Sequence, residues 1–244
     1  MAVNINTVYQ KVLAIANKEK RGYITPQEFN LFADQAQKEI FEQYFYDLNQ
    51  FKRVPGNTSE YSDMVDYLED KISFFSEVDK AVTVLDEFGN INISATIDDI
   101  HRLTQVNVKY LENTLSVVAE QSTQKDMSIY NNTTLAVQSK KRPVYVRKQN
   151  DTIQVYPFPN IDPLRDQVRI KYTRFPKKPD WAYKIINQKP FYDSTNSTNF
   201  ELHPSDESEL VYRILFMAGV AIEKPQLSQF AAQSQSAVVQ QEKQ

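Results

Sequence analysis

Apolar residues recur every three or four positions at both ends of the chain, which predicts amphipathic helices there. Near the start, this pattern covers residues 3–18, 26–49 and 59–75. Near the end, a further helix is predicted over 205–224, and its residues 210–222 are apolar nearly all round. We expect this last helix to begin with Ser205 as its N-cap and to be enclosed by its own domain or by a neighbouring subunit.

The middle of the chain has a period of two, which predicts β-strands. Two β-branched runs flank a Gly-Asn pair in 81–94 and predict a hairpin, and residues 144–155 alternate across a Lys-Gln-Asn-Asp turn. Residues 167–174 alternate apolar side chains with basic ones, so this strand has one apolar face and one basic face. With a further strand in 100–111, the pattern indicates a β-meander of roughly five strands, while 116–131 is ambiguous and can be helical.

These elements together predict an α+β fold, in which helical N- and C-terminal segments surround a β-meander or small β-sandwich insertion. We expect the N-terminal helices of 1–80 to pack with the C-terminal helices of 204–224. The β-rich insertion is expected at 81–180 and a connecting loop at 181–203. Residues 225–244 are rich in Gln, Ser and Ala, which predicts a C-terminal arm that becomes ordered on a partner.

The composition excludes several classes of protein. The chain has no cysteine, which excludes disulfides, thiol nucleophiles and iron–sulfur clusters and fits synthesis in a reducing cytoplasm. The first residues contain no charged segment followed by an apolar run, so we expect no secretory signal. The longest nearly apolar run, 210–222, contains Arg213 and is shorter than the roughly 20 residues of a membrane span. We therefore expect a soluble protein with no membrane partner.

Charge is distributed unevenly along the chain. Residues 60–99 contain eleven acids and two lysines, a balance of −9, and residues 138–178 contain eleven Lys or Arg and three acids, a balance of +8. Such blocks can be two solvated surfaces. They can also be complementary faces that meet between neighbouring copies, or, for the basic block, a surface that lies near nucleic acid.

The sequence offers little material for catalysis. It has two histidines and four glycines, and it contains no His-Glu-x-x-His motif, no nucleophile elbow and no phosphate-binding glycine loop. We expect structural or surface roles for His101 and His203. The acids of 60–99 are typical of a solvated helix face, with a two-carboxylate hydrolase as a minor alternative. We therefore expect a protein that is not an enzyme and binds no metal or cofactor.

One stretch imitates a calcium loop. Residues 17–29, NKEKRGYITPQEF, have Gly, Ile and Glu in the positions of an EF-hand. However, Arg21 stands where a ligand oxygen is needed, and three cations against two acids give the loop a balance of +1. Thr25, Pro26 and Glu28 instead fit a capping box, in which each polar side chain accepts a hydrogen bond from the other residue's amide. We expect this stretch to begin a helix and to bind no calcium.

Three longer segments carry a resemblance to a known family. They are RGYITPQEFNLFADQAQKEIFEQYFYDLNQF at 21–51, RPVYVRKQNDTIQVYPFP at 142–159 and FELHPSDESELVYRILFMAGVAI at 200–222. In this order, they resemble the head-to-tail connector, or neck ring, proteins of short-tailed bacteriophages, and most closely those of the crAss-like gut phages and their marine relatives. The likeness covers nearly the whole chain and lies in its layout.

This resemblance implies a structural virion protein of the phage neck, synthesised in the host cytoplasm. Such subunits form a ring, commonly twelve-fold, that connects the portal vertex of the capsid to the tail and encloses the DNA channel. The partners implied are other copies of the chain, the portal protein, the next neck-ring or tail hub protein and, transiently, DNA.

Two sets of site residues are expected, the first from the resemblance and the second from the charge pattern of the strands. The portal-docking arm would use Gln226, Leu227, Phe230, Val238 and Val239. A basic face towards a neighbouring subunit or the lumen would use Lys140, Lys141, Arg142, Arg147, Arg169, Lys171 and Arg174. Two alternatives stay open: a nucleic-acid-binding protein that uses the basic strands of 138–178, and another tail or capsid accessory protein that binds a different partner.

Overall fold

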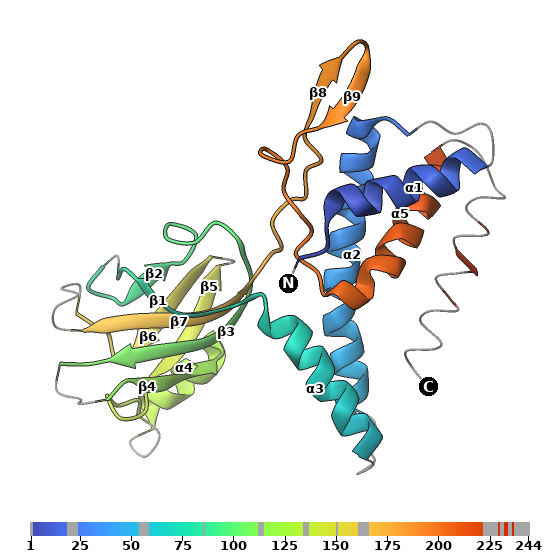
Figure 1. Cartoon of the computed structure of the whole chain (residues 1–244). Helices are drawn as coiled ribbons and strands as arrows, with labels where there is room; N and C mark the ends of the chain where they lie inside the picture. Colours follow the sequence, from blue (N-terminus) through green and yellow to red (C-terminus); the bar gives the residue numbers. More distant parts are fainter. Residues whose placement is uncertain are drawn as a thin grey trace. The chain divides into compact units, whose positions relative to one another are not determined.

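All four helices that the sequence predicts near the ends of the chain are present in the computed structural model (Figure 1). They are α1 (Ile5–Lys18), α2 (Pro26–Arg53), α3 (Ser59–Ser73) and α5 (Glu207–Ala221). The structure describes residues 2–18, 24–53, 59–84, 86–111, 115–133, 137–149, 151–160 and 166–221, together with 229, 232, 233 and 236.

The predicted capping box starts α2. The Thr25 amide donates to Glu28 Oε2 at 2.9 Å, and the Glu28 amide donates to Thr25 Oγ1 at 3.3 Å. The bonds from the Thr25 amide and hydroxyl lower the pKa of the Glu28 carboxyl below its ordinary value. Pro26 takes the first helical position, where its missing N–H costs no hydrogen bond. The Thr25–Glu28 pair is therefore architectural, as the sequence predicts.

The start of α5 differs from the prediction that Ser205 is the N-cap. A short 3₁₀ helix, η1 (Pro204–Asp206), precedes α5, and its N-cap is His203, whose Nδ1 accepts from the Ser205 amide. The Ser205 hydroxyl contacts Asp206 Oδ1 at 3.2 Å instead. The first turn of α5 carries two acids, Glu207 and Glu209, which interact favourably with the positive end of the helix dipole.

Most of the β-structure forms one curled seven-stranded sheet with the order β1-β7-β3-β4-β5-β6-β2 (Figure 1). The strands are β1 (Ser76–Val82), β2 (Asn90–Asn92), β3 (Ile100–Lys109), β4 (Val117–Ser122), β5 (Val144–Gln149), β6 (Thr152–Tyr156) and β7 (Gln167–Arg174). The fold class is thus α+β, with helical segments from both ends of the chain around a β-rich part, as predicted.

The pairing of these strands departs from a simple meander. The hairpin predicted at 81–94 is wrong, because β1 pairs with β7 and β2 pairs with β6. The Gly-Asn turn itself exists: Gly89 has φ +68°, and Asp86 accepts from the amide of Asn90. The ambiguous region 116–131 contains both strand β4 and helix α4 (Gln124–Asn132), and β4 and β5 pair in parallel.

The curl of the sheet encloses one apolar core, and α4 covers a second, smaller one. Residues from β1, β3, β6 and β7 fill the main core, including the fully buried Val106, Ile153 and Ile170. On the other side of β5, Met127 of α4 packs with Val144 and Val146. The first half of β5, residues 144–146, is therefore buried on both faces of the sheet, which explains its short apolar run, while residues 147–149 are exposed.

The chain divides into two units. The helical unit consists of Met1–Ser73 and Pro176–Gln244, and the β-rich unit consists of Phe74–Phe175. The stretch expected to be only a connecting loop, 181–203, contains an antiparallel hairpin of β8 (Tyr183–Ile186) and β9 (Lys189–Tyr192). Within the described residues, no helix is both long enough and apolar enough to cross a membrane.

Candidate functional site

Strand β7 carries cations on the face of the sheet that points away from the core. Arg169 is exposed and Lys171 is half-buried, while the residues between and beside them face inward. On the neighbouring strand β3, Asn107 lies opposite Arg169, and Lys109 lines the same shallow hollow. Arg169, Lys171 and Lys109 thus form a group that we name the β7 cation patch.

Arg174, at the end of the same strand, has a different environment. Its side chain is only 12% exposed, its Nε lies 3.6 Å from Glu77 Oε1 of β1, and its guanidinium carbon lies 5.9 Å from the ring centre of Phe75. The acidic and basic blocks of the sequence therefore meet partly within one chain, across the β1–β7 pair.

The other residues of the predicted basic face lie on or before β5. Lys140, Lys141 and Arg142 are exposed in the turn that leads into this strand. Arg142 forms an ion pair of 2.9 Å with Glu120. Arg147 is on β5 itself and lines a hollow with residues of β3. The structure thus brings Arg169 and Lys171 together and places these four residues elsewhere on the sheet.

The predicted portal-docking residues lie outside the described part of the chain. They are Gln226, Leu227, Phe230, Val238 and Val239.

The sequence analysis missed the hairpin β8–β9, which belongs to the helical unit and packs against its helices through the base of the hairpin (Figure 1). At its base, the ring of Trp181 is 2% exposed and stacks on Tyr183 and Tyr192, with both centroid distances at 5.8 Å. The same ring lies 4.2 Å from the ring of Tyr9 on α1, and the Trp181 amide donates to Asn30 Oδ1 on α2 at 2.9 Å. The base of the hairpin is therefore fixed to two helices.

This hairpin exposes three large apolar side chains. Ile185, Ile186 and Phe191 are 72%, 53% and 51% exposed. The turn between the strands consists of Asn187 and Gln188, with φ of 50° and 65°, the positive values of a tight two-residue hairpin. Side chains of this kind at the end of a fixed projection are suited to contact another molecule.

One face of the hairpin alternates cations with these apolar side chains. Lys184 lies opposite Phe191, and Ile186 lies opposite Lys189, so all four side chains share a face. Lys184 also forms an ion pair of 2.9 Å with Asp193. The hydrogen bond in this pair contributes most to lowering the pKa of the Asp193 carboxyl below its ordinary value. We name Lys184, Ile186, Lys189 and Phe191 the hairpin face.

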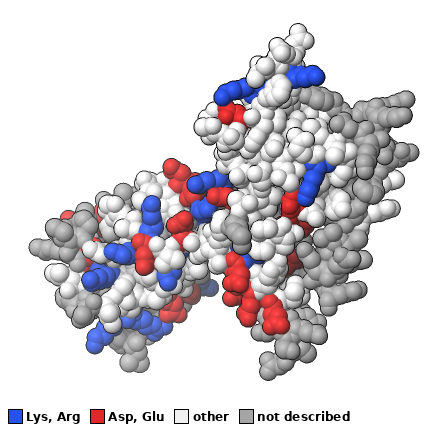
Figure 2. All heavy atoms as spheres, in the orientation of Figure 1, with Lys and Arg blue, Asp and Glu red and all other residues white. Residues whose placement is uncertain are grey.

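The exposed side of α3 has the opposite charge. Asp63, Asp66 and Asp70 are exposed and spaced to share one side of the helix. Tyr67, 38% exposed, lies at the margin of this side, and the cation Lys71 points inward instead. Figure 2 shows acidic side chains gathered at the end of the helical unit opposite the hairpin, which carries basic ones. We name Asp63, Asp66, Tyr67 and Asp70 the α3 acidic face.

A buried polar cluster holds α3 in place beneath this face. Lys71 Nζ lies 2.7 Å from Asp206 Oδ1, and the two side chains are 5% and 1% exposed. Tyr44 of α2 donates its hydroxyl hydrogen to the other carboxylate oxygen of Asp206. Burial first, and then the Asp206 charge, raise the pKa of Tyr44 far above its ordinary value, so this hydroxyl remains a donor. The cluster joins α2, α3 and η1.

A second buried cluster joins α2 to α5. Arg213 Nε donates to Glu209 Oε1 at 2.9 Å, and its side chain is 9% exposed. The same guanidinium also donates to Gln43 on α2 and lies 3.5 Å from Glu39. The arginine that interrupts the apolar C-terminal helix thus has a structural role.

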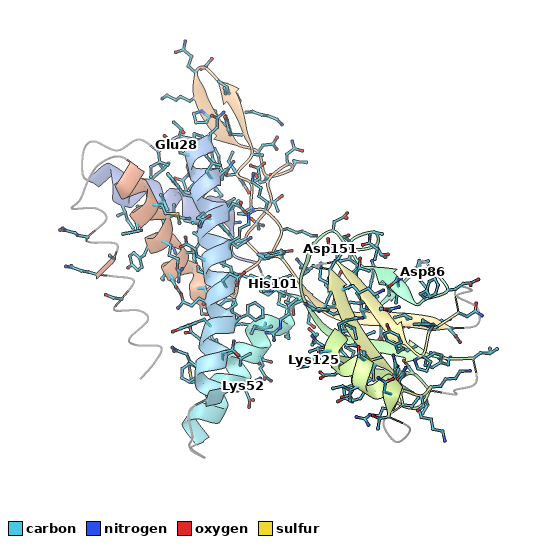
Figure 3. The ribbon with its side chains drawn as sticks, turned by 180° about the vertical axis from the view of Figure 1, so that it is seen from behind. Glu28, Lys52, Asp86, His101, Lys125 and Asp151 are labelled. Atoms are coloured by element: carbon cyan, nitrogen blue, oxygen red, sulfur yellow. The ribbon has the colours of Figure 1, made fainter. Side chains whose placement is uncertain are left out.

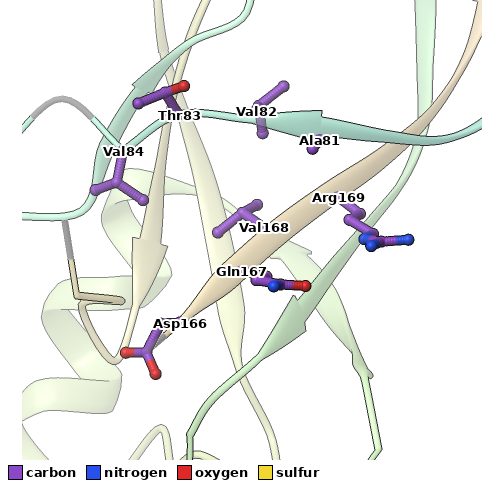
Figure 4. A pocket seen from close by; sticks show the side chains of 8 residues that line it. All are labelled: Ala81, Val82, Thr83, Val84, Asp166, Gln167, Val168 and Arg169. Carbon is purple, nitrogen blue, oxygen red and sulfur yellow. The ribbon is translucent and has the colours of Figure 1, made fainter. Parts of the chain in front are cut away.

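The hollows of the β-rich unit are small. One, of about 200 Å³, lies between residues 81–84 at the end of β1 and residues 166–169 at the start of β7 (Figure 4). Two others measure about 150 and 270 Å³, below the roughly 300–1,000 Å³ of common small-molecule sites. Asp166 beside the first hollow accepts from the amides of Leu111 and Asn160, which anchors two loops. Among the described residues, no His, Asp and Glu side chains are grouped to hold a metal ion.

No protein-family model matches the chain, and no curated protein sequence matches it. The described part of the chain thus has three candidate surfaces for contact with another molecule: the hairpin face, the α3 acidic face and the β7 cation patch.

Proposed function

We propose that the chain is a structural ring subunit of the virion neck, which connects the portal vertex of a short-tailed phage to its tail. The subunit contacts other copies of itself, the portal protein and the next neck-ring or tail hub protein. The ring, commonly twelve-fold, surrounds the channel through which DNA passes. The layout of the sequence, which resembles that of such connectors, is the origin of this proposal.

One structural observation supports it above the others. The helical unit carries two exposed surfaces of opposite charge, the hairpin face and the α3 acidic face, at different ends of its longest helix. A subunit that must contact neighbours on more than one side needs separate, fixed surfaces of this kind. The buried cluster at Asp206 fixes α3, and the buried Trp181 fixes the base of the hairpin.

The test combines the purified chain with the portal ring of the same phage. Light scattering and negative-stain microscopy should show rings of the chain attached to the portal. A truncated chain that lacks residues 226–244 should keep its fold and attach more weakly. A chain that stays strictly monomeric and never joins the portal would contradict the proposal, and unimpaired attachment of the truncated chain would refute the role of the arm.

The β7 cation patch supports a second candidate function, nucleic-acid binding. Lys109, Arg169 and Lys171 lie on an exposed sheet face, and cations of this kind neutralise phosphates without reading sequence. A gel-shift assay on short DNA should then show a complex that weakens with salt and with the change Arg169→Glu. The matched change Lys125→Glu, on α4, should have less effect. Absence of a shift at low salt would contradict a nucleic-acid-binding function.

A further inference from the structure

We propose that the hairpin face of one copy docks on the α3 acidic face of a second copy, in a head-to-tail contact. This inference deepens the proposed function and rests on it, because it names the surfaces through which ring subunits contact each other.

The hairpin provides a rigid donor surface. Its base is fixed by the buried Trp181, while Ile186 and Phe191 remain about half exposed beyond it, at 53% and 51%. The strands β8 and β9 contain Lys184 and Lys189 and no acidic residue. Because Lys184 is paired with Asp193, directly after β9, Lys189 is the cation that we assign to the contact. An exposed apolar surface flanked by cations favours a partner surface that is acidic and contains an aromatic or apolar side chain.

The α3 acidic face has these properties. Its exposed charges are all negative, because Lys71 is turned inward to Asp206. Tyr67 offers an aromatic ring at the margin, and its position is fixed, since its hydroxyl lies 2.8 Å from Ser205 Oγ and Lys71 Nζ lies 4.5 Å from its ring centre. The face is therefore preorganised, which lowers the entropy cost of binding.

The two surfaces cannot meet within one chain. The hairpin is bonded to α2 at Asn30, and α3 is bonded to α2 at Lys52, which pairs with Glu69 at 2.7 Å. At 1.5 Å of rise per residue, these two positions are about 33 Å apart along the helix. Figure 3 shows Glu28 and Lys52 near opposite ends of α2. Complementary surfaces at opposite ends of one rigid helix fit a heterologous contact between copies, the type that closes rings.

The absence of cysteine allows a direct crosslinking test. A variant with both Ile186→Cys and Asp66→Cys is treated with a short bis-maleimide. Each copy then carries both halves of the contact, so a ladder of dimers, trimers and larger species is expected. A mixture of the two single variants should give only dimers, because each pair of copies can then form one link.

The matched control is a double variant with Ile186→Cys and Ile129→Cys, in which the second cysteine lies on the exposed side of α4. If the double variant at 186 and 66 gives no more crosslinked product than this control, the proposed contact is wrong.

A charge exchange provides an independent readout. In the crosslinking background, Lys189→Glu should reduce the ladder by about tenfold, because like charges across an interface are strongly unfavourable. Asp70→Lys should do the same, and the two changes together should restore the ladder. Lys125→Glu changes the net charge equally and should have little effect. Loss without restoration would overturn the assigned pairing of the two faces.

The same variants distinguish this inference from the proposed function. A chain that joins portal rings, with or without Lys189→Glu, but forms no ladder keeps the proposed function and refutes the contact. A chain that forms the ladder but never joins the portal keeps the contact and refutes the connector function.

Discussion

Two ion pairs of nearly equal length have opposite meanings in the two units. In the helical unit, Lys71 and Asp206 are 2.7 Å apart, with side chains 5% and 1% exposed. In the β-rich unit, Arg142 and Glu120 are 2.9 Å apart, with side chains 69% and 59% exposed. The first pair is shielded from solvent, so removing either charge leaves the other one buried and unpaired at a high cost in stability. The second pair is solvated, so its ion pair adds little to the stability of the fold. Distance alone therefore does not indicate what an ion pair contributes.

The difference follows from how each unit is assembled. The helical unit joins both ends of the chain, so residues 135 positions apart, such as Lys71 and Asp206, must find each other. Buried polar clusters can fix which elements meet, because misaligned ones leave charges unpaired. The β-rich unit is one continuous segment around a large apolar core. Exposed cations of this unit, such as Arg142 and Arg169, lie outside that core and can contact a partner. Arg174 and Asp166 are exceptions, because they hold neighbouring elements together.

The largest effect is expected from Lys71→Met. This change leaves the Asp206 carboxylate buried without its cation, which should lower the free energy of unfolding of the helical unit by about 3–5 kcal/mol. Trp181 is the only tryptophan and lies in this unit, so urea unfolding followed by its fluorescence measures the loss.

The control for this prediction is the double change Lys71→Met with Asp206→Leu. Replacing both charges by apolar groups should recover much of the lost stability. A loss below about 1 kcal/mol for the single change would mean that the pair is no more than a surface pair in effect.

The next largest effect is expected in the apolar core of the β-rich unit. Ile170→Ala removes a fully buried side chain of β7 and should destabilise the β-rich unit by about 2–5 kcal/mol. Urea unfolding of the full chain, followed by circular dichroism in the β-sheet region of the spectrum, should show the loss. The unfolding midpoint followed by Trp181 fluorescence should move little. Valine at the same position is the milder control, with an expected loss of about 0.5–1.5 kcal/mol. An equal shift of the Trp181 midpoint would show that the two units unfold as one.

A smaller, pH-dependent effect is expected from Glu28→Gln. The pKa of the Glu28 carboxyl is lowered in the folded chain by the Thr25 amide and hydroxyl. A lowered folded pKa stabilises the fold above the ordinary pKa of 4.5, and this contribution disappears as the pH falls through the folded value. The variant should therefore be slightly less stable than the parent at pH 7 and equal to it at low pH. A difference that is constant with pH would contradict the charged capping box.

The local features of this fold could be predicted from the sequence, because they depend on near neighbours. The Thr25–Glu28 capping box spans four residues, and the β5–β6 hairpin follows from alternation on both sides of a short turn. The partner of β1 could not be predicted, because a period of two identifies a strand and not its neighbour. The Lys71–Asp206 pair was equally inaccessible, since nothing in either local pattern points to the other residue.

The missed hairpin β8–β9 had a weak signal. Its sequence, YKIINQKPFY, has apolar residues on both sides of Asn187 and Gln188. Pro190 lies within this run, and a proline weakens the pattern of a strand because it cannot donate to a sheet ladder. In a two-stranded sheet every strand is an edge, so the proline is tolerated there. The prediction of a connecting loop at 181–203 therefore missed the candidate surface that this hairpin forms.

The smallest effect is expected from Arg142→Ala, the counterpart of the change at Lys71. Both ends of the Arg142–Glu120 pair are in water, so its loss should leave the unfolding midpoint unchanged within error, and added salt should not alter that result. The matched variant is Arg142→Lys, which keeps the charge and should behave like the parent. A clear loss for alanine alone would show that this pair fixes the turn before β5. The contrast between buried charges that position elements and exposed charges free for partners would then fail in the β-rich unit.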